Sequence, residues 1–366
     1  MMMGPGYGHN IEPYLDYFNR HHDSYELVFI YWKRYDFFNE FKNIKAIKLE
    51  KKNIFKVLKE IRSKDLSLIW QHGNNILLYK LISFFKKKSV IHFLNIWSDR
   101  LYLEVKDSFI KRLIARIMLK KALIHCYWYT TTNNLKSQIK AAFYATIDCG
   151  LHRDIFIKEN GKNILSEHAK ALLTSVASLS GKKFFYPKSM TDAAGHFLIL
   201  EAMLKLKTAG FNNFTVIFRR GNEVNQTIEE AIKQFAFTHH LQEHLVIQEY
   251  AYLSFYELAL LWQQMDCGLQ IAYHDQLSTT FLEPMLFKKE LIATNIESYR
   301  IYKEVFGVEI ELCEIESESI FKRMAMVCAN TTTNDSTLEQ RKKVIEENFN
   351  FEHNVGKIID HYIAKV

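Results

Sequence analysis

The stretch that decides the fold spans residues 265–295 and reads MDCGLQIAYHDQLSTTFLEPMLFKKELIATN. It contains a short apolar run at 268–271, a polar loop, a segment with helical spacing of apolar residues at 279–287, and a second apolar run at 290–294. Apolar runs of this length on either side of a helix predict a strand–helix–strand unit with parallel strands. The stretch therefore predicts an α/β protein.

Strand and helix patterns alternate along the rest of the chain in the same way. We expect strands at 25–32, 44–49, 66–70, 90–94, 122–129, 145–148, 183–186, 214–218 and 245–247, and helices at 11–20, 53–62, 76–85, 107–121, 134–142, 163–178, 194–208, 226–238 and 254–264. Such alternation is typical of parallel sheets with helices on both faces. The pattern begins again near 156–182, which predicts two Rossmann-like domains. Ligands of such sheets bind at the carboxyl ends of the strands, so we expect a cleft between facing domains.

Composition limits the kind of protein this can be. The chain has 366 residues, of which 48% are hydrophobic and 24% are charged, and this balance is typical of a globular protein with two domains. No apolar run reaches the roughly 18 residues of a spanning helix, and the N-terminus lacks the basic and apolar regions of a secretory signal. The five cysteines have no CxxC spacing, so we expect reduced thiols in a cytoplasmic protein.

Charge divides the chain into a basic and an acidic half. Residues 1–156 contain 26 Lys and Arg against 14 Asp and Glu, whereas residues 157–366 contain 22 against 27. In the basic half, three lysines at 86–88 precede a helical pattern at 109–121 in which basic and apolar positions alternate. Such a helix either lies on an anionic membrane surface or covers a sheet with its basic face in water. No aromatic and basic platform accompanies the charge, so we expect no nucleic-acid partner.

The second half of the chain resembles the donor domain of the GT-B glycosyltransferases of family 4. In that family a strand with Asp and an apolar run is followed by two acidic residues eight apart, an EAM motif and a VVATD strand. Here Asp275 and Glu283 occupy the two acidic places, EPM replaces EAM, and residues 291–295 read LIATN. The first acidic residue is Asp where the family usually has Glu, and Gln276 and Ser278 replace loop glycines.

Three shorter segments extend the resemblance over nearly the whole chain. Residues 347–352 read ENFNFE, which resembles the family's ERFSWE segment, and the helix after that segment normally crosses back to the first domain. Residues 66–73 resemble a DVIHAHG strand end, and residues 147–156 resemble IPNGVDTERF, the last strand before the linker. The resemblance implies a GT-B fold with an acceptor-side domain at 1–156, a nucleotide-sugar donor domain at 157–350 and a returning C-terminal helix at 351–366.

The activity that the resemblance implies is transfer of a sugar from a nucleotide-sugar donor to a glycan or lipid-linked acceptor, with retention of the anomeric configuration. The implied setting is assembly of a bacterial surface polysaccharide such as lipopolysaccharide, in the cytoplasm or on the inner face of the membrane. We expect no metal or other cofactor, since the sequence has no paired DxD site for a divalent ion. Two alternatives stay open: an inverting GT-B transferase, and a non-catalytic sugar-nucleotide-binding protein docked on a membrane.

In the donor domain, the resemblance places Glu283 against the ribose, because a carboxylate there accepts hydrogen bonds from both hydroxyls. The start of the same helix, at Ser278, Thr279 and Thr280, suits the diphosphate, since free backbone N–H groups and the positive end of the helix dipole attract anions. Asp275 then faces the hydroxyls of the donor sugar, near the reacting carbon. The alternatives are a solvated glutamate or the partner of a local cation, a helix N-cap, and an ordinary loop aspartate.

The donor site also needs cations, because negative charge develops on the diphosphate as the glycosidic bond breaks. The family supplies an Arg and a Lys, in a GR…KG pattern after the first strand of the second domain. Here Lys188 retains one cation, but an alanine stands in the place of the second. Arg219 and Arg220, at the end of the next predicted strand, are candidates to compensate, and the alternative is a solvated basic turn.

The first domain offers fewer signals. Gly6 and Gly8 lie in a glycine-rich loop that lets the donor phosphate or the acceptor approach the backbone closely, although only three methionines precede it where the first strand belongs. The acceptor-side histidine of the family is not clearly present. His72, at the end of a predicted strand, is the candidate catalytic side chain of this domain, whereas we interpret His92 as a core histidine inside a strand.

Overall fold

A computed structural model describes the chain in segments. These are residues 2–4, 8–24, 27–31, 42–48, 53–63, 66, 68–72, 76–87, 89, 91–96, 123–126, 165–191, 194–220, 225–248, 253, 255–275, 279–331 and 333–363. The chain forms two compact units, one of residues 1–148 with 352–366 and one of residues 149–351. Among the described helices, none has both the length and the apolar character needed to cross a bilayer.

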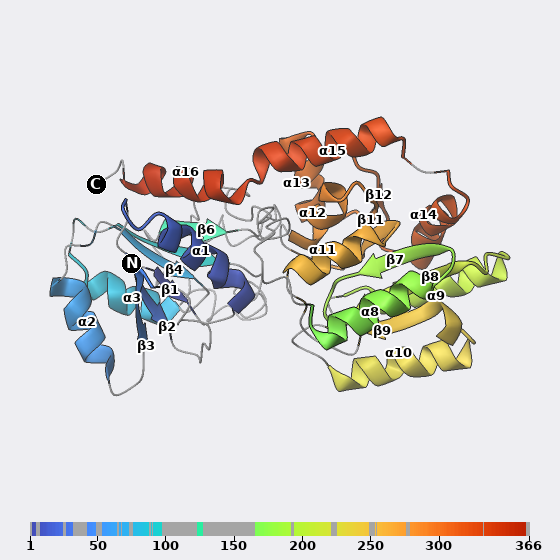
Figure 1. Ribbon diagram of the computed structural model, residues 1–366, viewed down its shortest axis with the longest axis horizontal. Coiled ribbons are helices and arrows are strands. Elements are labelled where there is room, and N and C mark those ends of the chain that lie inside the picture. The colour runs from blue at the N-terminus through green and yellow to red at the C-terminus, as the bar shows by residue number, and fades with distance from the viewer. Residues whose placement is uncertain are drawn as a thin grey trace, which may run out of the picture. The chain divides into compact units, whose positions relative to one another are not determined.

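The described part of the first unit is built on a six-stranded sheet in the order β3-β2-β1-β4-β5-β6 (Figure 1). All neighbouring strands in it are parallel. The strands are β1 (Met2–Gly4), β2 (Leu27–Tyr31), β3 (Ile44–Lys48), β4 (Leu68–His72), β5 (Ile91–Ile96) and β6 (Leu123–Cys126). The helices are α1 (Gly8–Arg20), α2 (Ile54–Ser63), α3 (Ile76–Phe85) and α16 (Phe351–Ile363).

The first strand is short but central. β1 has three residues, and Met2 aligns with Phe29 of β2 on one side and with Trp70 of β4 on the other. Met2 and Met3, together with Gly4, therefore form a short first strand before the glycine-rich loop.

The second unit contains a six-stranded parallel sheet in the order β12-β11-β10-β7-β8-β9, counted over its described residues. Its strands are β7 (Lys182–Tyr186), β8 (Phe214–Arg219), β9 (Leu245–Gln248), β10 (Cys267–Gln270), β11 (Glu290–Thr294) and β12 (Leu312–Cys313). Its helices are α8 (Glu167–Ser178), α9 (His196–Thr208), α10 (Gln226–Thr238), α11 (Phe255–Gln263), α12 (Thr279–Leu286), α13 (Glu297–Phe306), α14 (Ser317–Cys328) and α15 (Asp335–Asn348). Two parallel sheets covered by helices confirm the predicted α/β class. The predicted elements at 107–121, 134–142 and 145–148 lie outside the described residues.

The strand β10 shows why helices cover both faces of the second sheet. Cys267 and Leu269 point into a large core that also takes side chains from α9, α10 and α14. Gly268 points to the other face, because side chains alternate along a strand. A Cβ atom on Gly268 would lie 2.8 Å from Pro284 of α12 and 3.0 Å from Trp262 of α11. The absence of a side chain at this position allows both helices to pack directly on the strand.

The C-terminal helix α16 belongs to the first unit, although it follows the whole of the second unit in the sequence. Its buried side chains include Val355 and Ile359, which are four residues apart and share one helix face. Glu352 at its start pairs with Arg20 at the end of α1, with 2.5 Å between Oε1 and Nη1. A Cβ atom on Gly356 of α16 would also lie 3.6 Å from the hydroxyl of Tyr17 in α1, and Figure 1 shows the two helices next to each other.

Candidate functional site

The candidate site lies at the topological switch point of the second sheet. From β7, the chain continues through β8 to β9 on one side, and through β10, β11 and β12 on the other. All six strands are parallel, so the loops that follow β7 and β10 leave from the same edge, on either side of the point where the strand order reverses. In open α/β sheets this is where ligands bind.

The loops after β7 and β10 are joined to each other by hydrogen bonds of the backbone and of the Tyr186 hydroxyl. Gly195 N donates to the carbonyl of Ile271 at 3.0 Å, and the hydroxyl of Tyr186, at the end of β7, also donates to this carbonyl. The Tyr186 hydroxyl in turn accepts from Gly195 N at 2.9 Å. Burial raises the pKa of Tyr186, so its hydroxyl remains protonated and can act as the donor. These contacts fix the spacing of the two loops.

Gly195 is placed where a side chain does not fit. A Cβ atom there would lie 2.4 Å from Cγ2 of Ile271 and 3.0 Å from its carbonyl oxygen. We therefore expect Gly195→Ala to destabilise the protein by about 1–3 kcal/mol, because the β-branched Ile271 has little freedom to move away. Thermal unfolding measures the effect. The control is the double variant Gly195→Ala with Ile271→Ala, which removes the Cγ2 contact and leaves the carbonyl oxygen at 3.0 Å. The loss from Gly195→Ala should be smaller in that background, and equal losses in both backgrounds would contradict the steric explanation.

One carboxylate oxygen of Asp275 interacts with two side chains. Lys188 Nζ, after β7, pairs with Oδ2 of Asp275, after β10. Tyr299 of α13 donates its hydroxyl to the same Oδ2 at 2.6 Å. The phenol is fully buried, and burial together with the negative Asp275 raises the pKa of Tyr299, which keeps its proton. Lys188 and Asp275, both predicted site residues, thus meet across the switch point.

Glu283 lies in α12 with only 4% of its surface exposed. Its Oε2 accepts a hydrogen bond of 2.9 Å from Nε1 of Trp262. Burial raises the pKa of Glu283, whereas Trp262, Arg219 and Lys188 favour its charged form. The carboxylate is therefore close enough to both cations to interact with their charges. This agrees with the alternative that Glu283 is a partner of local cations, and the ribose role of Glu283 stays a prediction.

The two arginines after the second strand of this unit have different surroundings. Arg219 ends β8, on the edge that carries Lys188, and its charge favours ionised Glu283. Arg220 instead pairs with Glu229 of α10, with 3.0 Å between Nε and Oε2. Arg219 is therefore the better candidate for the missing second cation, and Arg220 has a structural partner of its own.

The start of α12 is anchored to the end of β10. Gln270 Nε2 donates to the carbonyl of Thr280 at 2.8 Å, and Thr280 Oγ1 donates to Gln270 Oε1 at 3.2 Å. The helix begins at Thr279, as predicted, and its N-terminus leaves from the same loop as Asp275. Ser278 lies outside the described residues.

The candidates of the first unit are less completely placed. Gly8 is the first residue of α1, and Gly6 lies outside the described residues. His72 is the last residue of β4, aligned with Asn95 of β5, which confirms that it stands at a carboxyl strand end. His92 is a core histidine, as interpreted: it is 3% exposed, and its ring nitrogens lie 3.0 Å from Ser83 Oγ and 3.2 Å from Gln71 Oε1.

Trp262 and Tyr299 lie at the site and were not predicted as site residues. A buried Trp usually finds an acceptor for its N–H, so the single Trp of α11 carried a signal that a polar partner is near. No such signal exists for Tyr299, because its partner Asp275 is 24 residues away and on another element. His196 was also missed; it begins α9, is 1% exposed, and packs edge-on against Tyr186 and Phe218.

His196 makes the second unit sensitive to acid. Burial lowers the pKa of His196 to about 4, below the usual 6.5. Between these values the unfolded chain binds a proton that the folded chain does not, so stability is complete above about pH 6.5 and is lost as the pH falls. Between pH 7 and pH 5, the free energy of unfolding should fall by about 2 kcal/mol more in wild type than in His196→Phe, because the variant has no imidazole to protonate. Thermal unfolding at both pH values tests this, and equal losses would contradict it.

Within the described segments, no three or more His, Cys, Asp or Glu side chains come together as they would around a metal ion.

Comparison with known proteins gives matches in structure but not in sequence. No protein-family model matches the chain, and no curated protein does. Among solved structures, a glycosyltransferase from Rickettsia africae ESF-5 is similar over 100% of this chain and 98% of its own, with a TM-score of 0.75 and 15% sequence identity. HepE from Anabaena, solved in complex with UDP and glucose, is similar over 100% and 99%, with a TM-score of 0.74 and 10% identity.

A third similar structure is sucrose-phosphate synthase from Thermosynechococcus elongatus, which covers 100% of this chain and 99% of its own with a TM-score of 0.70 and 12% identity. Identities this low establish the fold alone. The matches nevertheless extend over the full length of both partners, so they include both sheets. They confirm the predicted fold, an α/β protein of the GT-B type.

Proposed function

We propose that this protein is a glycosyltransferase that takes its sugar from a nucleotide-sugar donor bound by the second unit. The observation that carries the proposal is the meeting of Lys188 with Asp275, beside Arg219 and Glu283, at the switch point of the second sheet. Cations at this place neutralise a diphosphate, and carboxylates accept hydrogen bonds from ribose and sugar hydroxyls. HepE structures with UDP and with UDP-glucose make uridine nucleotides the first donors to test.

In the proposed mechanism, the donor diphosphate competes with Asp275 for Lys188. When Lys188 pairs with the diphosphate instead, Asp275 keeps its hydrogen bond from Tyr299. The other carboxylate oxygen of Asp275 can then accept a hydrogen bond from the donor sugar. Lys188 and Arg219 stabilise the charge that develops on the leaving diphosphate. The first unit supplies the acceptor site, with His72 at a carboxyl strand end as its candidate side chain. The acceptor would be a glycan or lipid-linked sugar of a bacterial surface polysaccharide, and the configuration would be retained.

A non-catalytic sugar-nucleotide-binding protein is the second candidate. It is favoured by the alanine in the place of the second lysine and by the burial of Glu283 behind Trp262. Both candidates bind the donor, but only the transferase moves the sugar. Release of free nucleoside diphosphate in the presence of an acceptor separates them.

Donor binding is tested by the thermal stability of the protein with UDP, UDP-glucose, GDP and GDP-mannose. A ligand at 100 times its dissociation constant stabilises the folded state by about 2.7 kcal/mol, so at least one nucleotide should raise the Tm. Lys188→Gln should weaken this stabilisation. Lys182→Gln is the matched control: Lys182 also pairs with an aspartate, Asp266 at 3.4 Å, but at the opposite end of β7. No Tm change with any nucleotide would contradict the proposed donor site.

A further inference from the structure

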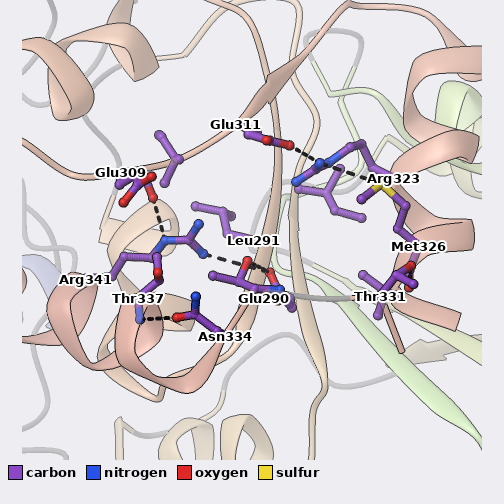
Figure 2. Close-up of a pocket in the computed structure, with 14 residues that line it drawn as sticks. Glu290, Leu291, Glu309, Glu311, Arg323, Met326, Thr331, Asn334, Thr337 and Arg341 are labelled. Atoms are coloured by element: carbon purple, nitrogen blue, oxygen red, sulfur yellow. Dashed lines mark hydrogen bonds and ion pairs between the residues drawn. The ribbon is translucent and has the colours of Figure 1, made fainter. Parts of the chain in front are cut away.

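A separate cavity lies at the opposite edge of the second sheet from the candidate donor site (Figure 2). It has a volume of about 310 Å³ and lies beside Glu290, the first residue of β11, whereas the donor candidates follow the last residues of the strands. Helices α14 and α15 contribute Arg323 and Arg341 to its wall. The volume is within the range of cavities that bind small ligands.

Arg341 is the charged side chain that the cavity leaves incompletely paired. It is 6% exposed, and its Nε donates to the carbonyl of Glu309 at 2.6 Å. Its Nη1 is also buried and has no hydrogen-bond acceptor among the described residues. The carboxylate with which it forms an ion pair, Glu290, is 3.9 Å away and already accepts two hydrogen bonds from Thr333. A buried guanidinium N–H without an acceptor is costly, so this cavity is suited to a ligand oxygen.

The charges of the wall disfavour an anion as that ligand. Arg323 is already paired with Glu311, and the three glutamates Glu290, Glu309 and Glu311 outnumber the two arginines. The wall therefore carries a net negative charge, which opposes phosphate or carboxylate groups. It presents N–H donors, carboxylate acceptors and threonine hydroxyls together, which is the mixture that a hydroxyl group uses, since a hydroxyl both donates and accepts.

The remaining wall is apolar. Leu291, Ile292, Ile310 and Val327 are buried side chains of the lining, and Met326 is 42% exposed. Figure 2 shows Leu291 between the two arginines, with Met326 beside Arg323. A ligand with hydroxyls on its edges and C–H groups on its faces fits a wall of this kind better than a fully polar one does.

We propose that this cavity binds a neutral sugar residue, with the Arg341 guanidinium donating to a sugar oxygen and the apolar side chains covering the C–H face. The inference does not rest on the proposed transferase activity, because it uses residues at the other edge of the sheet. It adds a second carbohydrate site to the second unit.

Saturation-transfer NMR on the full chain tests this directly, with glucose, galactose, mannose and N-acetylglucosamine as probes and inorganic phosphate as the anionic comparison, measured by ³¹P line broadening. We expect saturable binding of at least one sugar at this cavity, and no phosphate binding that a substitution in the cavity wall removes. Arg341→Gln should weaken sugar binding about tenfold, the loss expected for one hydrogen bond from a charged group. Met326→Trp, which fills the cavity from a partly exposed position, should abolish it.

The matched control is Lys343→Gln, on the same helix but with a side chain 73% exposed, which should leave sugar binding unchanged. If Arg341→Gln does not fold, Thr337→Val removes a hydroxyl of the lining and should weaken binding in the same direction. The proposal is overturned if no sugar binds, if phosphate binds and the sugars do not, or if Met326→Trp binds sugar as wild type does. The last result would place the sugar elsewhere on the protein.

Discussion

Replacing Lys188 with glutamine is expected to lower kcat for sugar transfer by about 100-fold or more, because a preorganised positive group at a developing negative charge contributes on this scale. The change removes the cation that faces Asp275 across the switch point and leaves the Tyr299–Asp275 hydrogen bond in place. Release of nucleoside diphosphate from the donor found by thermal shift measures kcat and KM.

The control for this experiment is Lys182→Gln, at the amino end of β7, the strand that Lys188 follows. Lys182 and Lys188 each pair with an aspartate that flanks β10, so both variants break a Lys–Asp pair in one sheet. Only the pair at the carboxyl end should affect catalysis. If both variants transfer sugar at the wild-type rate, Lys188 does not serve the leaving group. If both lose activity equally, the loss reflects folding.

Glu283→Gln is expected to weaken donor binding about tenfold or more, because it removes a charge-assisted acceptor for the ribose hydroxyls. Glutamine keeps an amide oxygen that can accept from Trp262, so the fold should persist. Glu283→Ala should have the same effect on binding and should also destabilise the protein by about 1–3 kcal/mol, since the buried Trp262 N–H loses its acceptor. Nucleotide titration and thermal unfolding measure the two effects separately.

Glu257 is a matched control for Glu283 in the same unit. It is a buried glutamate of α11 whose Oε1 accepts two hydrogen bonds of 2.7 Å from Ser166. Glu257→Gln should lower the Tm and leave the donor affinity unchanged. Wild-type donor affinity in Glu283→Gln would contradict the ribose role and leave Glu283 as a structural partner of Trp262.

Much of the fold could be predicted because its elements bury regular patterns. The helix at 226–238 and the strand at 290–294 begin and end where the sequence predicted, since each has apolar residues at one period between polar ends. Beyond residue 294, only the C-terminal helix was predicted, and the structure has it as α16. α13 carried a usable signal in Tyr299, Tyr302 and Phe306, at helical spacing, but α15 buries only Arg341 and Ile345 and has no apolar stripe.

The site could be predicted only in part, for a similar reason. Lys188 and Asp275 follow parallel strands, so topology alone brings them to one edge, and the structure places them together. The burial of Glu283 could not be predicted, because it depends on another helix. Glu283 occupies the helix position expected for a ligand contact, but Trp262 of α11 covers it. The separate roles of Arg219 and Arg220 also depended on a partner, Glu229, that belongs to the next helix.

The position of α16 in the sequence affects the order in which the two units can be completed on the ribosome. The second unit is one continuous segment, so residues 149–351 are all available once that segment has left the exit tunnel. The first unit lacks the helix that pairs with Arg20 until residues beyond 351, which follow the whole second unit, have been translated. A nascent chain that stalls near residue 350 would therefore expose the part of α1 that contacts α16, so the unit that is translated first can be completed only after the second one.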